Sequence, residues 1–144
     1  MEILILDERG ICPDHAALRS LAEHVLAQEG APPETELSIA LVGGEEMAEL
    51  NEKYLGREGP TDVLSFLMQE QEEEAYLLGD VIVCPDEVAS RGDEYGVEPG
   101  SEVSLVLAHG ILHLMGYDDE EEEAYLRMDK RQRELLQEWG EREI

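Results

Sequence analysis

The chain has 144 residues, of which 42% are apolar and 32% charged, a composition typical of a folded domain rather than a disordered chain. Ten basic residues against 36 acidic ones leave a formal net charge of −26, which opposes non-specific binding to the phosphate backbone of nucleic acids. No stretch approaches the ~20 consecutive apolar residues that cross a bilayer, so we expect no membrane partner.

The start of the chain and its cysteines favour a cytoplasmic protein. Residues 1–7 lack the basic region of a signal peptide and are typical of a β-strand. The two cysteines, Cys12 and Cys84, match no metal-binding spacing, so we expect free thiols in a reducing compartment. Neither an internal repeat nor a long linker occurs, and we expect one domain over residues 1–144.

The first half of the chain predicts strands and helices in alternation. A strand over residues 2–7 precedes a helix that Pro13 and Asp14 open and that ends near Gly30. A second strand over 36–42 is broken by two glycines, and a short helix over 45–54 follows it. A short strand over 63–66 ends this half of the chain.

The second half adds one strand and three helices. An acidic loop leads to a strand over 77–84, and Pro85 starts a helix that runs to about Tyr95. The most apolar helix spans about 102–114, and an amphipathic helix spans about 121–139. This order predicts an α+β fold: a small mixed β-sheet of about four strands covered by helices, with the 102–114 helix at its centre.

Two of the four histidines lie on this central helix. His109 and His113 are four residues apart, so their imidazoles lie on one face, one turn apart, and can bind the same ion. Such a pair is often only two surface or core histidines. Here the helix is apolar, and two imidazoles without partners would be unfavourable to bury, which favours a metal site.

Asp119 is the candidate third ligand. It follows His113 by six residues, beyond a glycine turn where the chain can fold back toward the helix. This spacing is typical of a three-ligand zinc site with an open fourth position, which lowers the pKa of a bound water toward neutrality and yields a hydroxide nucleophile. Asp118, Glu120 and Glu121 compete for this role, although an acidic cap at the start of the next helix is the simpler interpretation of each.

The spacing is similar to the extended zinc-peptidase motif, His-Glu-x2-His-x2-Gly-x2-His/Asp, with one difference. A metallopeptidase needs a general-base glutamate directly after the first histidine, and this chain has Gly110 there. The zincin-like site therefore predicts a metal-dependent hydrolase that is a poor peptidase.

Three blocks, in order along the chain, carry a specific family resemblance. The last, residues 109–118, reads His-Gly-Ile-Leu-His-Leu-Met-Gly-Tyr-Asp. The first contains Leu50, Asn51, Tyr54 and the run Pro-Thr-Asp-Val-Leu-Ser-Phe at 60–66, and the middle one is Gly-Asp-Val-Ile-Val at 79–83. Together they resemble the YbeY family of rRNA-maturation endoribonucleases, whose signature is His-Gly-x-Leu-His-Leu-x-Gly-Tyr-Asp-His. The resemblance covers nearly the whole chain.

This resemblance implies a zinc-binding α+β fold and a single-strand endoribonuclease. It implies action in 16S rRNA 3′-end maturation and ribosome quality control, with the small ribosomal subunit, its rRNA and ribosomal or assembly-factor proteins as partners. One Zn²⁺ per chain is the implied cofactor, held by His109, His113 and a third ligand. The family has a histidine at the third position, where this chain has Asp119, whose charge reduces the Lewis acidity of the ion.

Candidate substrate-binding residues lie in the first block. The family usually has an arginine directly after the tyrosine, where this chain has Leu55, so Arg57 becomes the candidate catalytic phosphate ligand, with an ordinary loop arginine as the alternative. Thr61 and Ser65 are candidates for hydrogen bonds to RNA phosphates, with capping and strand-edge roles as alternatives. Asp62 is a candidate partner for a metal-binding histidine.

The acidity leaves a second class of function open. Basic residues are thinly spread, so either a small positive cleft or a partner positions the RNA, and we expect weak, salt-sensitive activity on free RNA. The alternative is a non-catalytic ribosome-assembly factor, in which the metal only fastens the loop at 116–119 to the helix.

Overall fold

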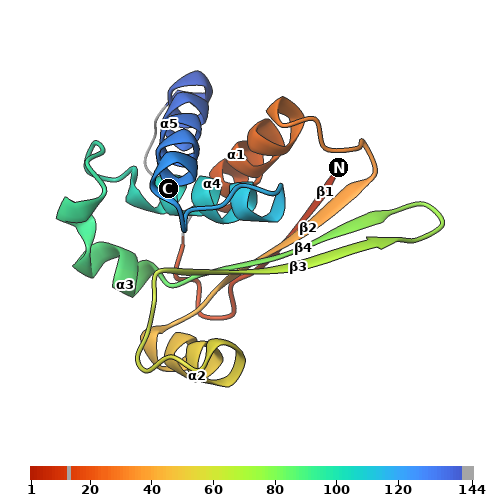
Figure 1. Ribbon diagram of the computed structural model, residues 1–144. Coiled ribbons are helices and arrows are strands. Elements are labelled where there is room, and N and C mark those ends of the chain that lie inside the picture. Colours follow the sequence, from red (N-terminus) through yellow and green to blue (C-terminus); the bar gives the residue numbers. More distant parts are fainter. Residues whose placement is uncertain (13, 141–144) are drawn as a thin grey trace.

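A four-stranded mixed sheet forms the centre of the fold. The computed structural model describes residues 1–12 and 14–140, and the strand order is β1-β2-β4-β3. The strands β1 (Glu2–Leu6), β2 (Thr35–Leu41) and β4 (Tyr76–Val83) run parallel, and β3 (Val63–Gln71) pairs antiparallel with β4. The predicted α+β fold with a small mixed sheet is confirmed (Figure 1).

Helices cover both faces of this sheet unequally. The helices α1 (His15–Gln28), α4 (Glu102–Leu114) and α5 (Glu122–Trp139) lie on one side, and α2 (Gly44–Leu55) lies on the other (Figure 1). Burial along β2 alternates from residue to residue, because successive side chains of a strand point to opposite faces. The main core therefore forms on the side of the three helices. No helix in the described ranges is long and apolar enough to cross a membrane.

The structure confirms Asp14 as the residue that caps the start of α1. The Asp14 carboxylate accepts a hydrogen bond from the Ala17 amide at 2.9 Å, which satisfies one of the free amides of the first turn. Pro13, at the predicted start of this helix, lies outside the described residues. The helix predicted to be central, α4, contacts α1, α5, β3 and β4, and its apolar side chains are buried among them.

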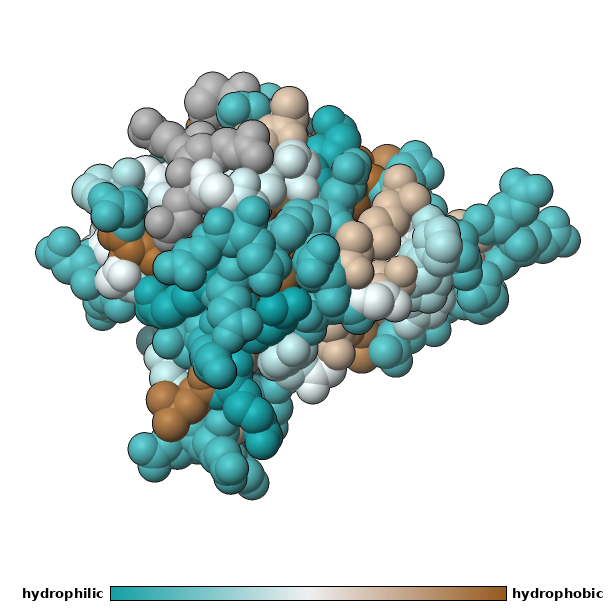
Figure 2. Space-filling view, turned by 90° about the horizontal axis from the view of Figure 1, so that it is seen from above, coloured by the Kyte–Doolittle hydropathy of each residue, from teal (hydrophilic) through white to brown (hydrophobic). Residues whose placement is uncertain are grey.

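The hairpin of β3 and β4 is longer than the sequence predicts. Instead of a strand over 63–66 and an acidic loop, β3 continues to Gln71, and a short turn joins it to β4. No residue of β3 beyond Leu64 is buried, so its outer part lacks the apolar alternation by which a strand is recognised. The hairpin extends past the helices in Figure 1, and its end is a hydrophilic projection in Figure 2.

The helix predicted from Pro85 to about Tyr95 ends early. It spans only Pro85–Ser90 (α3), and a separate 3-10 turn, η1 (Gly92–Glu94), follows it. Gly92 is a weak helix former, and the Arg91 side chain donates both to Glu87 within α3 at 3.1 Å and to the Pro60 carbonyl at 3.4 Å. The early end of α3 lets the chain turn, and Tyr95 then lies beside the start of β3, where its hydroxyl donates to Asp62.

Candidate active site

The two histidines of α4 face each other at the edge of the core. The ring centroids of His109 and His113 are 4.7 Å apart, with an angle of 86° between the ring planes. Their side chains remain 24% and 31% exposed, whereas the residues beside them on α4 are buried. This face of α4 is therefore open to solvent and to small ligands.

The loop after α4 returns Asp119 to these histidines. A turn at Gly116, whose φ of 100° favours glycine, reverses the chain. Asp119 Oδ2 then lies 3.5 Å from His109 Nε2 and 3.3 Å from His113 Nε2. Within the described part of the chain, these three residues form a group whose possible ligand atoms all lie within 4.8 Å of one another. The carboxylates of the neighbouring acidic residues are not in this group.

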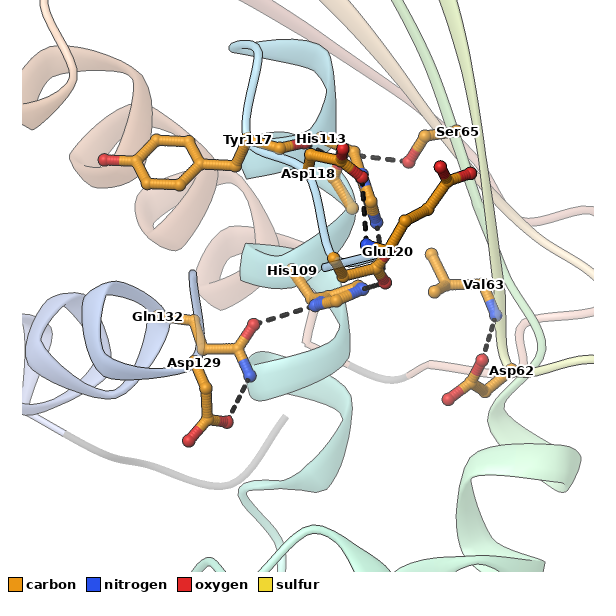
Figure 3. Close-up of polar contacts among 12 residues, drawn as sticks. Asp62, Val63, Ser65, His109, His113, Tyr117, Asp118, Glu120, Asp129 and Gln132 are labelled. Atoms are coloured by element: carbon orange, nitrogen blue, oxygen red, sulfur yellow. Dashed lines mark hydrogen bonds and ion pairs between the residues drawn. The ribbon is translucent and has the colours of Figure 1, made fainter. Parts of the chain in front are cut away.

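Hydrogen bonds on the far side of each imidazole direct its Nε2 atom to the same point (Figure 3). His109 Nδ1 donates to the Gln132 side-chain oxygen at 2.9 Å, and the Gln132 amide nitrogen donates to Asp129 at 3.1 Å. His113 Nδ1 donates to the Tyr117 carbonyl at 3.2 Å, an oxygen that can only accept. With the ring proton on Nδ1, each histidine satisfies its outer partner and turns an Nε2 lone pair toward Asp119, whose Oδ2 lies 3.3 Å from His113 Nε2.

The convergence of these three atoms suits a cation. Burial lowers the pKa of His109 and outweighs the opposing effect of the Gln132 hydrogen bond, while the nearby His113 lowers it further, so the neutral imidazole is favoured. Imidazole nitrogens and a carboxylate oxygen are the ligand atoms that zinc commonly takes in proteins. Zinc bonds of ~2.0–2.2 Å at tetrahedral angles separate the ligand atoms by roughly 3.3–3.5 Å. The observed separations of 3.3 and 3.5 Å fit this geometry.

The prediction that Asp62 is the hydrogen-bond partner of a metal-binding histidine is wrong. Asp62 accepts hydrogen bonds from the Tyr95 hydroxyl and the Val63 amide, each at 2.8 Å, and forms no hydrogen bond or ion pair with His109 or His113. Its carboxylate is held at the start of β3 because α3 ends at Ser90 and the segment that follows places Tyr95 beside it. Gln132 and the Tyr117 carbonyl take the predicted role instead.

Gln132 was missed because it belongs to a different helix, 23 residues from His109. One sequence signal pointed to it. Gln132 is a polar residue at helical spacing from Met128, Leu135 and Leu136, within the apolar stripe of α5, and the structure shows it buried. A buried amide in such a stripe needs hydrogen-bonding partners, and a histidine on the facing helix supplies one.

The predicted substrate-binding residues line a cavity of about 470 Å³ that also contains His109, His113 and Asp119. Arg57 is exposed, and its guanidinium has no hydrogen-bond or ion-pair partner among the described residues. The Thr61 hydroxyl lies 3.4 Å from Asp62, at the limit of a hydrogen bond. The Ser65 hydroxyl donates to the Gly110 carbonyl at 2.8 Å, so only its lone pairs remain for a ligand.

Gly110 lies where α4 approaches the sheet most closely. A Cβ atom at this position would lie 2.7 Å from Val81 Cγ1 and 3.1 Å from Val63 Cγ2. It would also lie 3.2 Å from Ser65 Oγ, so a side chain at this position would point into the sheet, where the space is already filled. The general-base glutamate of a metallopeptidase therefore does not fit at this position without displacement of β3 or β4.

Comparison with known proteins agrees with this architecture. The family model described as endoribonuclease YbeY matches residues 7–140. The endoribonuclease YbeY proteins of Thermobifida fusca and Acidothermus cellulolyticus are 38% and 40% identical to this chain; each alignment covers 96% of it and 94% and 92% of the relative. The chain belongs to the YbeY family.

A solved structure supports the fold of this YbeY-family chain. The solution structure of TM1509 from Thermotoga maritima aligns with a TM-score of 0.61 and 31% identity, over 95% of this chain and 91% of that one. The resemblance read from the three sequence blocks is thus confirmed as family membership.

We expect replacement of Gln132 by alanine to weaken metal binding by roughly 10- to 100-fold, the usual effect of losing a hydrogen-bond partner of a ligating histidine. Without the Gln132 oxygen, His109 can rotate or carry its proton on Nε2. Competition with a chromogenic chelator measures the affinity. The control is Gln137→Ala, on the exposed face of the same helix, and equal affinities in the two variants would contradict the role of Gln132.

Proposed function

We propose that the chain is a metal-dependent endoribonuclease that cleaves single-stranded RNA and uses one Zn²⁺, bound by His109, His113 and Asp119. The observation that carries the proposal is the convergence of the three side-chain ligand atoms, all within 4.8 Å of one another, in a cavity that is also lined by an unpartnered arginine. Membership of an endoribonuclease family supports RNA as the substrate.

Each residue of the cavity would have a separate role in substrate binding. Bound zinc would act as a Lewis acid toward a phosphoryl oxygen and lower the pKa of a water molecule. Arg57 would bind a non-bridging phosphate oxygen, for which its planar guanidinium is well suited. Thr61 would donate a hydrogen bond to the same phosphate, and Ser65 would accept one from the ribose. Gln132 and the Tyr117 carbonyl keep the two imidazoles oriented.

The biological role that we infer is 16S rRNA 3′-end maturation and ribosome quality control in the cytoplasm. With 36 acidic against ten basic residues, the chain is poorly suited to holding RNA by charge alone. The small ribosomal subunit or one of its proteins would then position the rRNA strand, while the cavity supplies the local phosphate contact.

The test is metal analysis of the wild type beside Asp119→Ala. We expect about one zinc per chain in the wild type and a loss of affinity of at least roughly 100-fold in the variant, because a lost ligand exceeds the effect of a lost outer partner. Inductively coupled plasma mass spectrometry after dialysis measures the content, and cleavage of a labelled single-stranded RNA should fall in parallel.

The matched control is Asp118→Ala. The Asp118 carboxylate accepts from the Glu120 amide at 3.0 Å, so this variant removes a neighbouring charge and leaves the three ligand atoms in place. Equal zinc content in both variants would show that Asp119 is not a ligand.

A further inference from the structure

We propose that a second cavity, adjoining His109, binds a nucleobase of the RNA and prefers guanine to uracil. This inference rests on the endoribonuclease function proposed above. The cavity measures about 240 Å³ and lies between α4, α5, η1 and the start of β3. His109, Asp62 and Val63 line both this cavity and the one that contains Arg57, so the two adjoin.

The walls of this cavity suit the flat face of a base. Tyr125, in the first turns of α5, lines it and is 48% exposed, although the helix around it is strongly polar. Leu105 and Val106 of α4 add an apolar surface. Single-stranded RNA is commonly bound by stacking its bases on aromatic side chains, which accept any base through its π-face.

The charge of the cavity distinguishes a base from a phosphate. Three carboxylates line it, those of Asp62, Glu94 and Asp129, against the single guanidinium of Arg133. Such a surface repels a phosphate group, whereas Arg57 in the adjoining cavity attracts one. A nucleotide that spans the two cavities would therefore place its phosphate at the Arg57 side and its base at the Tyr125 side.

The hydrogen-bonding groups select among the bases. Each nitrogen of the Arg133 guanidinium already donates one hydrogen bond: Nε to Asp129 at 3.1 Å, Nη1 to the Gly96 carbonyl at 3.2 Å and Nη2 to the Tyr95 carbonyl at 2.7 Å. The Tyr95 hydroxyl donates to Asp62 at 2.8 Å. The side chain of Glu94 is exposed, and its carboxylate, which only accepts, has no hydrogen-bond or ion-pair partner among the described residues.

A cavity that offers acceptors favours a base that presents donors. Guanine has two adjacent donor groups on its Watson–Crick edge, N1–H and the N2 amino group, which match the two oxygens of one carboxylate. Uracil has a single N–H between two carbonyl oxygens, and a carboxylate repels those carbonyls. The geometry thus predicts cleavage of the phosphodiester next to guanine more often than next to uracil.

Titration of the full-length protein with guanosine and with uridine tests this inference without requiring cleavage. Saturation-transfer NMR measures binding of these nucleosides, which carry no phosphate. We expect guanosine to bind more tightly than uridine, and Tyr125→Ala to bind guanosine about 5- to 100-fold more weakly, the range that stacking on an aromatic ring supplies. Tyr125→Phe retains the ring and should bind as the wild type does.

A second pair of variants tests the edge contact. Glu94→Gln should reduce the preference for guanosine over uridine, whereas Asp93→Asn, an exposed neighbour that does not line the cavity, should leave it unchanged. Sequencing the cut ends of a random RNA pool should give the same order of bases for each variant.

The two proposals fail in different ways. If the wild type cuts RNA and Tyr125→Ala binds guanosine as tightly as the wild type, the base site is wrong and the endoribonuclease function stands. If guanosine binding follows the variants as expected but no preparation cuts RNA, the base site stands and the proposed function is wrong. Equal binding of guanosine and uridine by the wild type overturns the preference for guanine.

Discussion

Replacement of His113 by alanine is expected to leave the protein folded and to reduce cleavage of single-stranded RNA by at least roughly 100-fold, beyond the effect of losing an outer partner of a metal ligand. His113 is the second-last residue of α4, and its side chain is 31% exposed, so its removal leaves the core intact. Its Nε2 atom is one of the three that converge beside the Arg57 cavity. Gel analysis of a labelled RNA measures cleavage, and circular dichroism measures folding.

The same experiment separates the enzyme from the non-catalytic assembly factor. The control is His24→Ala, which removes a histidine on α1 that lies 3.3 Å from Glu138 of α5. In an assembly factor, the metal would only hold Asp119 and its loop against α4. His113→Ala would then lower the melting temperature, and neither the wild type nor any variant would cut RNA. Cleavage by the wild type and by His24→Ala, with none by His113→Ala, supports the enzyme.

Replacement of Gly110 by glutamate is expected to lower the free energy of unfolding by about 3–5 kcal/mol, because it places an uncompensated charge in the core. The substitution completes the His-Glu-x2-His peptidase motif in sequence, yet a Cβ at this position would lie 2.7 Å from Val81 Cγ1. The new carboxylate would point into β3 and β4. Urea denaturation measures the stability, and casein digestion measures any peptidase activity.

Two controls isolate the cause of this loss. Gly110→Ala adds only the crowded Cβ atom and should lower the free energy of unfolding by about 1–2 kcal/mol, within the range for overpacking. Gly44→Glu adds the same charge at the first residue of α2, where a Cβ meets nothing within 4 Å, and should change stability by less than about 0.5 kcal/mol. A stable Gly110→Glu variant that digests casein in proportion to its metal content would contradict the structural reason for excluding a peptidase.

Local sequence patterns were sufficient for most of the fold. The apolar composition of residues 102–114 predicted a central helix, and α4 is enclosed by α1, α3, α5 and two strands. The spacing of His109 and His113 predicted that their rings lie together, because four residues make about one helical turn. Predictions failed where the local pattern was weak. The outer half of β3 is an example: its residues pair with β4, but they are exposed and show no alternation between core and solvent.

The sequence by itself determined the order of strands and helices, the pair of histidines and the position of a nearby carboxylate, since each depends on residues within one or two turns of the chain. Only the tertiary structure decided that Asp119 meets both imidazoles, that Gln132 rather than Asp62 supports His109, and that a second cavity adjoins the first. The physical reason is that these contacts join α4 to the loop that follows it, to α5, to β3 and to the segment after α3. Their geometry depends on how the core packs, and no periodicity along the chain encodes that packing.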